Sequence, residues 1–472
     1  MKNILKAAAV LLLGAILLSA ILPYEEALGA ATIKIFLNGR EMKPDVPPTM
    51  KSGRVLVPFR FLGENLGAYV NWDEKTRTIT AVKGSTKVIL RIGDRTAYIN
   101  GNQVKLDVTA TIVKGRTLVP IRFFCEAFNA AVDWNSAKNA VYITLKDGIA
   151  KHILGYYYSS SYEDFIKNLD KLSSVATKWY TLDENGNLVD YDNSRYIMKP
   201  QDYNLVFEAA RKNGIKIYAL VFESDRARLS QVLSTQQNRQ ALIDQIVKEV
   251  VEENYDGVNI DFEYIKAEDR ENFNSFIKDL YSALKSKNKS LNISLPAKTE
   301  KQDWWPAYDY EMLGKYSDFV VLMAYDRSPS TPGPQAGIDW TREVVEYAVK
   351  RISPQKVVLG IGYYGYAWAN GQRYTVLEKK NQMTYSKILF IDELKSKYGL
   401  KMSLDSNSLM AYGSFKDENG VSYEIWAESS ASVDAKCKMA IEKGLKGIAV
   451  WRLGYTTDNF WNAVYGNFRA AK

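Results

Sequence analysis

The sequence predicts an α/β protein in which a small α+β repeat domain precedes a closed (β/α)8 barrel with a small insertion between strands 7 and 8. Strand-like and helix-like segments alternate along the C-terminal two thirds of the chain, and an internal repeat occupies the N-terminal part. The length of 472 residues exceeds a typical single domain. We therefore expect a targeting segment over residues 1–30, the repeat domain over 32–147 and the barrel over 150–470.

The first segment has the layout of a secretory signal. Lys2 and Lys6 flank the start of an apolar run that extends to Leu22, and small residues follow near Ala30. The run of about sixteen residues is shorter than the ~20 that span a membrane comfortably, although an uncleaved anchor is the alternative. We expect a secreted or cell-wall-associated protein.

The repeat domain is defined by two copies of one pattern. Residues 53–72 and 115–134 align at a constant offset of 62, with 11 of 20 positions identical. Each copy predicts an apolar strand, a short amphipathic helix after Pro-x-Arg, and further strands around a Trp. The repeat resembles the N-terminal stalk domain of copper amine oxidases. The single His of the chain, His152, lies outside it, so we expect no copper site, no other metal and no cofactor.

The positive charge of the chain is concentrated in this domain. Residues 32–147 hold 18 Lys and Arg against 10 Asp and Glu, which equals the net charge of +8 of the whole sequence. Such a surplus on an exported protein favours adhesion to anionic cell-wall polymers, with a generic soluble surface as the alternative. Nucleic acid is a poor fit because the cations form no clustered run.

Eight strands of the barrel can be placed by hydrophobic pattern. Helix-like segments separate most of them, for example 202–213, 342–352 and 432–443. The expected strands are 153–158, 174–181, 215–222, 257–262, 291–296, 318–325, 357–363 and 447–451. The interval 366–430 is longer than one helix, so we expect it to contain the inserted lobe.

The fourth strand carries the most informative pattern in the chain. Its alternation places Asn259, Asp261 and Glu263 on one face and apolar residues on the other. A half-polar surface strand could look the same. However, this strand lies within a β/α alternation where strands are buried on both faces, and buried carboxylates are costly without a function. The pattern therefore predicts a catalytic site.

The run from Asp256 to Glu263 resembles the signature of glycoside hydrolase family 18, the chitinase-like (β/α)8 barrels. The resemblance implies that Glu263 is the general acid and then the base, and that Asp261 orients the 2-acetamido group of the sugar, whose oxygen attacks the anomeric carbon. Asp256 is expected to support the strand from below. Asn259 stands where the family has Asp, which removes one titrating group and leaves the pH optimum governed mainly by Glu263.

Other strand ends supply candidate substrate contacts by the same resemblance. Met323, Tyr325 and Asp326 resemble the sixth-strand motif, in which Tyr325 would hydrogen-bond the acetamido oxygen. Trp451 closes the eighth strand, where the family places a Trp under the reacting sugar. Ordinary barrel packing is the alternative for Met323 and Trp451.

Asn259 and several shorter segments resemble the branch of the family found in spore and cell-wall lytic enzymes. In that branch Trp426 and Glu428 are plausible substrate contacts, and Tyr157 near the end of the first strand is a further candidate. The expected partner is a polysaccharide that contains N-acetylglucosamine.

These observations predict a retaining glycoside hydrolase that cleaves β-1,4 bonds through an oxazolinium intermediate. Peptidoglycan or spore cortex is favoured over chitin-type chains because of the basic domain and the branch resemblance. A non-catalytic carbohydrate-binding barrel and a surface adhesin are the alternatives. The sequence does not decide between exo and endo action, nor does it reveal the oligomeric state.

Overall fold

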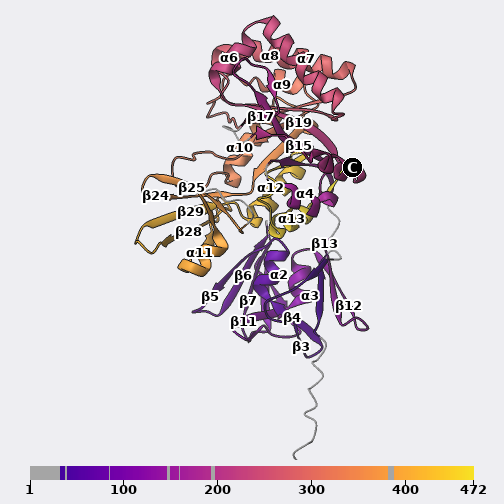
Figure 1. The fold of residues 1–472 in the computed structure, drawn as a ribbon. Coiled ribbons are helices and arrows are strands. Elements are labelled where there is room, and N and C mark those ends of the chain that lie inside the picture. The colour runs from indigo at the N-terminus through magenta and orange to yellow at the C-terminus, as the bar shows by residue number, and fades with distance from the viewer. Residues whose placement is uncertain are drawn as a thin grey trace, which may run out of the picture.

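The computed structural model describes residues 32–37, 40–83, 86–145, 149–158, 160–192, 197–380 and 387–471. The predicted export signal lies outside these residues. Within them, no helix combines the length and apolar character needed to cross a membrane. The chain forms a repeat domain and a larger barrel, with a lobe projecting from the barrel (Figure 1).

The repeat domain consists of three antiparallel or mixed sheets around two short helices. The helices are α2 (Phe59–Asn65) and α3 (Ile121–Ala127), and each follows the Pro of its repeat. The strand orders are β12-β13-β1-β2, β10-β11-β4-β3 and β5-β6-β7-β8-β9. The strands are β1 (Lys34–Leu37), β2 (Arg40–Met42), β3 (Thr49–Lys51), β4 (Arg54–Pro58), β5 (Tyr69–Asp73), β6 (Thr78–Lys83), β7 (Thr86–Arg91), β8 (Thr96–Ile99), β9 (Asn102–Lys105), β10 (Thr111–Val113), β11 (Arg116–Pro120), β12 (Ala130–Asn135) and β13 (Ala140–Leu145).

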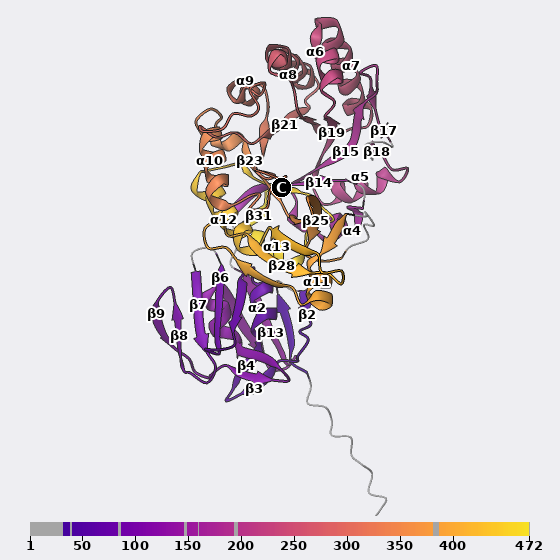
Figure 2. The ribbon, with the colours of Figure 1, turned by 90° about the vertical axis from the view of Figure 1, so that its left-hand side faces the viewer.

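The predicted (β/α)8 barrel is confirmed. Eight parallel strands close on themselves because the first strand, β14, pairs with both the second, β15, and the eighth, β30. The strands are β14 (Ile149–Tyr157), β15 (Ser174–Leu182), β19 (Lys216–Glu223), β20 (Gly257–Phe262), β21 (Ser290–Pro296), β22 (Phe319–Met323), β23 (Val357–Gly362) and β30 (Gly447–Trp451). Figure 2 shows the helices arranged around them.

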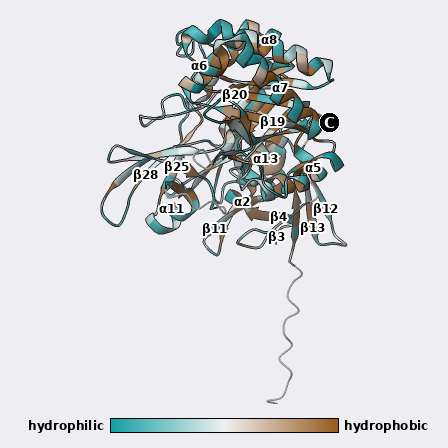
Figure 3. Ribbon diagram, turned by 45° about the horizontal axis from the view of Figure 1, so that its top comes forward, coloured by the Kyte–Doolittle hydropathy of each residue, from teal (hydrophilic) through white to brown (hydrophobic). Residues whose placement is uncertain are grey.

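The helices cover the outside of the barrel and bury its outward-facing apolar residues. Those of the barrel are α4 (Tyr162–Lys167), α5 (Tyr203–Lys212), α6 (Arg226–Ser234), α7 (Gln236–Glu252), α8 (Arg270–Ser286), α9 (Tyr310–Lys315), α10 (Ile338–Val349), α12 (Ser430–Glu442) and α13 (Asp458–Tyr465). Short strands β16 (Leu188–Val189), β17 (Tyr191–Asp192), β18 (Ile197–Met198) and β31 (Phe468–Ala470) complete this part. Figure 3 shows the contrast between hydrophobic barrel strands and the hydrophilic outer surfaces of the helices.

The predicted insertion between strands 7 and 8 is confirmed as a lobe over residues 365–427, in which the described residues 365–380 and 387–427 form six strands and one helix. Its strand order is β26-β25-β24-β29-β28-β27. The elements are β24 (Gly365–Ala369), β25 (Gln372–Leu377), β26 (Ile388–Phe390), α11 (Ile391–Tyr398), β27 (Lys401–Leu404), β28 (Ala411–Lys416) and β29 (Ser422–Ala427). The lobe has its own apolar core, so it extends the barrel as a separate layer.

The repeat domain is packed against the barrel and the lobe. Helix α2 touches α13, and β6 touches α12 (Figure 1). A methyl group built on Gly67 would lie 3.0 Å from the Ala463 backbone, so the two surfaces leave no room for a side chain there. The Tyr69 hydroxyl donates to the Met402 carbonyl of the lobe at 3.0 Å. Tyr465 packs against the cores of both domains, which makes this a close junction.

Candidate active site

The polar face of β20 points into the barrel. Val258, Ile260 and Phe262 belong to the core between strands and helices, while Asn259 and Asp261 alternate with them and face the interior. All six residues of the strand are buried. The carboxyl ends of parallel barrel strands meet at one end of the barrel, and chemistry collects at this end in barrels of this kind.

Asn259 is fixed by a chain of hydrogen bonds across three strands. The Tyr156 hydroxyl and the Ser294 hydroxyl lie 2.8 Å apart, and Ser294 donates to Asn259 Oδ1 at 3.1 Å. Asn259 Nδ2 then donates to Asn292 Oδ1 at 2.5 Å. The amide thus accepts on one side and donates on the other, whereas a carboxylate at this position would only accept.

Asp261 is buried, with 3% of its surface exposed, and its Oδ1 atom has no hydrogen-bond partner among the described residues. Burial raises the pKa of this carboxyl, while the Lys178 ammonium and the nearby Ser294 hydroxyl act in the opposite direction. A buried acceptor without a partner is unfavourable unless a ligand supplies the donor. Asp261 is therefore positioned to receive an N–H or O–H group from a bound molecule.

Glu263 follows the end of β20, and its backbone N–H donates to the Glu223 carbonyl at 2.8 Å. Burial, reinforced by the negative charges of Asp261 and Asp326, raises the pKa of its side chain to about 7, although Lys178 opposes the shift. A carboxyl with a pKa near neutrality can donate a proton and then take one back, as a general acid and base must.

Asp256 lies at the opposite end of β20 from Glu263. Its Oδ2 accepts a hydrogen bond from the backbone N–H of Ile217 at 2.8 Å, at the start of β19. The side chain therefore links two neighbouring strands at their amino ends. This position agrees with a supporting role below the strand and keeps Asp256 away from a bound substrate.

Tyr325 occupies space that glycines on β23 leave open. A methyl group on Gly360 would lie 2.4 Å from the Leu322 carbonyl oxygen and 3.3 Å from the Tyr325 ring, and one on Gly362 would also reach that ring. Burial raises the pKa of the Tyr325 phenol well above its ordinary value, so this group is a neutral hydrogen-bond donor. Met323, the last residue of β22, is partly buried.

Asp326 connects the barrel to the lobe. Its Oδ1 accepts hydrogen bonds from the hydroxyls of Tyr364 and Tyr366, each at 2.8 Å. The residue has a φ of +57°, a left-handed backbone conformation that Asp adopts more readily than most residues other than Gly. Two phenols thus hold the loop after Tyr325 in place.

Trp451 lies at the end of β30 and packs against the interior cluster of the barrel. Its ring forms an edge contact with Tyr156, with centroids 5.5 Å apart. The Lys178 ammonium lies 5.0 Å from the centroid of its ring. The indole is partly exposed at the mouth of the barrel, where a sugar platform is expected.

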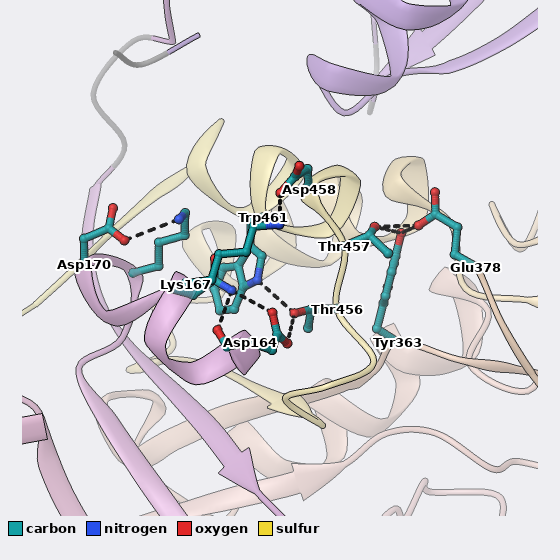
Figure 4. Close-up of polar contacts among 11 residues, drawn as sticks. Asp164, Lys167, Asp170, Tyr363, Glu378, Thr456, Thr457, Asp458 and Trp461 are labelled. Atoms are coloured by element: carbon teal, nitrogen blue, oxygen red, sulfur yellow. Dashed lines mark hydrogen bonds and ion pairs between the residues drawn. The ribbon is translucent and has the colours of Figure 1, made fainter. Parts of the chain in front are cut away.

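A polar network fixes the loop that follows Trp451 (Figure 4). Asp164 accepts from the backbone N–H of Gly454 at 2.7 Å and from the Thr456 hydroxyl, which in turn accepts from the Trp461 indole at 2.9 Å. On the other side of the loop, Glu378 of the lobe accepts from Tyr363 and Thr457, both at 2.6 Å. These bonds join the lobe, the loop and the barrel.

Trp426 lies on the face of the lobe sheet that is directed toward the mouth. It is paired in register with Tyr366, whose hydroxyl reaches Asp326, and with Tyr412 on the other side. The rings of Trp426 and Tyr412 stack with centroids 5.1 Å apart. The lobe therefore presents an aromatic surface on this side, which suits contact with sugar rings.

Two predicted site residues have other positions. Tyr157 faces the helix layer, with its ring against Phe165 and Trp179, because the register of β14 directs Tyr156 inward instead. Glu428 is paired with Lys436 at 2.5 Å, and 1% of each side chain is exposed. We correct both predictions, since Tyr157 is directed away from the barrel interior and Glu428 is held in an ion pair with 1% of its side chain exposed.

Sequence reasoning missed four residues of the mouth: Tyr156, Lys178, Asn292 and Ser294. Asn292 and Ser294 alternate with leucine and isoleucine on a buried strand, the same signal that identified Asn259. Lys178 is a lysine inside a strand that is otherwise buried. The alternation of polar residues on the strands next to β20 could have located them.

Two hollows lie at the junction of the repeat domain, the lobe and α13, with volumes of about 840 and 740 Å³. Both are lined by Arg60, Glu64, Trp72 and Asn459 and carry side chains of either charge. Because positive and negative side chains both line these hollows, the hollows do not form an anion-binding site. Among the described residues, His, Cys, Asp and Glu side chains form no group of three that could hold a metal ion.

Comparison with protein families divides the chain in two. The family described as glycosyl hydrolases family 18 matches residues 152–456, and the copper amine oxidase N-terminal domain matches residues 36–143. An uncharacterized glycosylase of Bacillus subtilis is 28% identical over 324 residues, which cover 65% of this chain and 88% of the relative. A cortical fragment-lytic enzyme of Bacillus anthracis is 30% identical over 220 residues, 46% of this chain. The match spans only about half of that enzyme's length.

Solved structures share the fold. A chitinase of Chromobacterium violaceum superposes with a TM-score of 0.59 at 27% identity, over 67% of this chain and 99% of the chitinase. The spore cortex-lytic enzyme of Bacillus megaterium gives a TM-score of 0.59 at 23% identity, over 78% of this chain and 80% of that chain. The second comparison concerns the fold alone.

Proposed function

Because this chain belongs to glycosyl hydrolases family 18 and is a glycosidase, we propose that it cleaves β-1,4 bonds next to N-acetylglucosamine with retention of configuration. The observation that carries the proposal is the unpartnered Oδ1 of Asp261, beside a glutamate whose pKa is about 7. The acceptor, Asp261, and the proton donor, Glu263, therefore lie close together at the mouth of the barrel. The 2-acetamido group of a sugar offers the N–H that the acceptor lacks.

The proposed reaction begins with protonation of the glycosidic oxygen by Glu263. Asp261 accepts the acetamido N–H and offsets the positive charge that develops, while Tyr325 donates to the acetamido oxygen. That oxygen attacks the anomeric carbon as the glycosidic bond breaks, which gives an oxazolinium intermediate. Glu263, now ionised, removes a proton from water, and the water opens the ring.

Substrate assistance is supported by the placement of the carboxylates. A retaining enzyme with a protein nucleophile needs two carboxyl groups about 5–5.5 Å apart, on opposite sides of the bond. Asp261 lies on β20 and Glu263 directly follows this strand, so the two-residue spacing favours the same face for both side chains. The sugar's own acetamido oxygen therefore serves as the nucleophile in this proposal.

Matched substrates test the proposal. We expect hydrolysis of an aryl β-glycoside of N-acetylglucosamine and a loss of at least about 10²-fold with the corresponding glucoside, which lacks the amide. Digestion of purified peptidoglycan and of chitooligosaccharides, with the new reducing ends identified, assigns the polymer. We favour peptidoglycan or spore cortex, since cortical fragment-lytic enzymes are among the relatives. Equal rates on the two glycosides would disprove substrate assistance.

We also propose that the protein is exported and that its repeat domain holds it on anionic wall polymers. The domain carries the whole net charge of the chain, and cations such as Arg95, Lys105 and Lys114 are exposed on it. Replacing these three by Glu in the full chain should reduce sedimentation with isolated walls, whereas Lys212→Glu and Lys287→Glu on the barrel should not. Unchanged retention would count against tethering, and activity on soluble glycosides serves as the folding control.

A further inference from the structure

A lysine inside the barrel mouth has no part in the reaction described so far. Lys178 lies on β15 in a strand of buried residues. Its ammonium is 3.4 Å from the centroid of the Phe222 ring, 5.0 Å from that of Trp451 and 5.8 Å from that of Tyr158. Three aromatic rings thus surround the cation where the sugar platform is expected.

The ammonium is close to Asp261 without touching it. Phe222, under the cation, is the direct register partner of Asp261 on the neighbouring strand. Across the part of the chain that the structure describes, Lys178 forms no ion pair and no hydrogen bond. The rings therefore hold the charge at a fixed place near the carboxylate, since a cation over an aromatic face is attracted to it.

The neighbours of Asp261 explain why a cation is needed there. Position 259 is an uncharged amide, so Asp261 cannot share a proton with a second carboxyl on the same strand. Burial by itself favours the protonated form of Asp261, and that form could not offset positive charge on the sugar. A direct ion pair would keep Asp261 ionised, but it would also occupy the oxygen that must accept the hydrogen bond from the sugar amide.

We propose that Lys178 is a positioning residue for hydrolysis, because its ammonium keeps Asp261 ionised from a distance and leaves Oδ1 free for the sugar amide. This inference rests on the proposed function. Burial lowers the pKa of Lys178, and the charges of Asp261 and Glu263 oppose this shift by favouring the ammonium. Arg452 also faces the ammonium, and Glu263 also faces Asp326. The remaining neighbours, Tyr156 and Tyr325, stay neutral because burial raises the pKa of both phenols.

The pH dependence of kcat and kcat/KM tests the proposal. Lys178→Met should move the acidic and the alkaline limb of each pH–rate profile to higher pH by on the order of one unit. The reason is that Asp261 and Glu263 each lose a favourable neighbouring charge. Lys178→Arg should restore the wild-type limbs. Lys199→Met is the matched control, since Lys199 lies 4.2 Å from the Tyr203 ring on the outside of the barrel, and we expect no movement of either limb.

Two outcomes would overturn the inference. One is a uniform loss of activity in Lys178→Met with both limbs unmoved, which would assign the lysine to packing. The other is a loss confined to glycans that bear carboxylates, which would assign it to recognition of an acidic sugar substituent. Either result is distinguishable from an alkaline shift on a neutral chitooligosaccharide.

A measurement without turnover separates this inference from the proposed function. In Glu263→Gln protein labelled with ¹³C at the Asp carboxyls, the resonance of Asp261 can be titrated directly. Adding Lys178→Met to this variant should raise the titration midpoint of Asp261 by on the order of one pH unit. If the wild type hydrolyses no glycan, the proposed function fails, yet this titration still decides what Lys178 does. An unchanged midpoint would refute the role given to it.

Discussion

Two regions of this protein bury carboxylates, and they treat them in opposite ways. At the base of the lobe, Glu428 and Lys436 are in contact at 2.5 Å and shielded from solvent. Each of Glu428 and Asp261 keeps one oxygen without a hydrogen-bond partner among the described residues, but at the barrel mouth the neighbouring lysine, Lys178, stays out of contact with Asp261. The comparison teaches that a buried carboxylate in direct contact with an ammonium serves the fold, whereas one whose ammonium is held at a distance on aromatic rings remains open to a ligand.

The largest expected effect concerns the mouth. Glu263→Gln should lower kcat by about 10²–10⁴-fold, because the variant cannot donate the proton that cleavage needs. Below pH 4.5 its melting temperature should match that of the wild type, since the amide replaces a protonated carboxyl of similar shape. Steady-state kinetics and thermal denaturation check both parts. Retained activity would show that Glu263 is not the proton donor of the reaction.

Substitutions in the Glu428–Lys436 pair should change the free energy of unfolding and leave the catalytic activity unchanged. Lys436→Met leaves Glu428 buried without its partner, which should lower the free energy of unfolding by about 3–5 kcal/mol. Adding Glu428→Gln should recover much of this loss. Urea denaturation measures the change, and kcat of the folded protein should hold. As a control, Lys397→Met breaks an exposed pair with Glu418 and should cost less than about 1 kcal/mol.

The raised pKa of Glu263 predicts that the stability of the protein depends on pH. The folded protein binds this proton more tightly than the unfolded chain, because the pKa rises from an ordinary 4.5 to about 7. The resulting stability is fully present below pH 4.5 and is lost as the pH rises through 7. The melting temperature of the wild type should therefore fall relative to Glu263→Gln between these values. A constant difference would contradict the shift.

The smallest expected effect is at position 259. Asn259→Asp adds a second carboxyl beside Asp261, which should move the acidic limb of the rate profile to higher pH by less than about one unit. The fold should tolerate the change, because Asn292 has an unpaired Nδ2 that can donate to the new carboxylate after its amide turns. An unchanged profile would contradict the account of Asn259.

Much of the barrel could be predicted from local pattern. The fourth and eighth strands have the predicted bounds, and the other six are found within a few residues. Alternation along β20 also placed Asn259 and Asp261 on the same face. The prediction for Tyr157 was wrong because two adjacent tyrosines end β14, and alternation alone does not say which one points inward.

The sequence by itself determined the eight strands, the repeat and the spacing of the polar residues on β20, since these depend on neighbours in the chain. Only the tertiary structure decided which side chains meet. The pairing of β15, β19 and β20 brings Lys178 over Phe222 and beside Asp261, and the return of the chain from the lobe pairs Glu428 with Lys436. Burial and charge act through space, so the chemistry of these groups is set by residues on different elements of the fold.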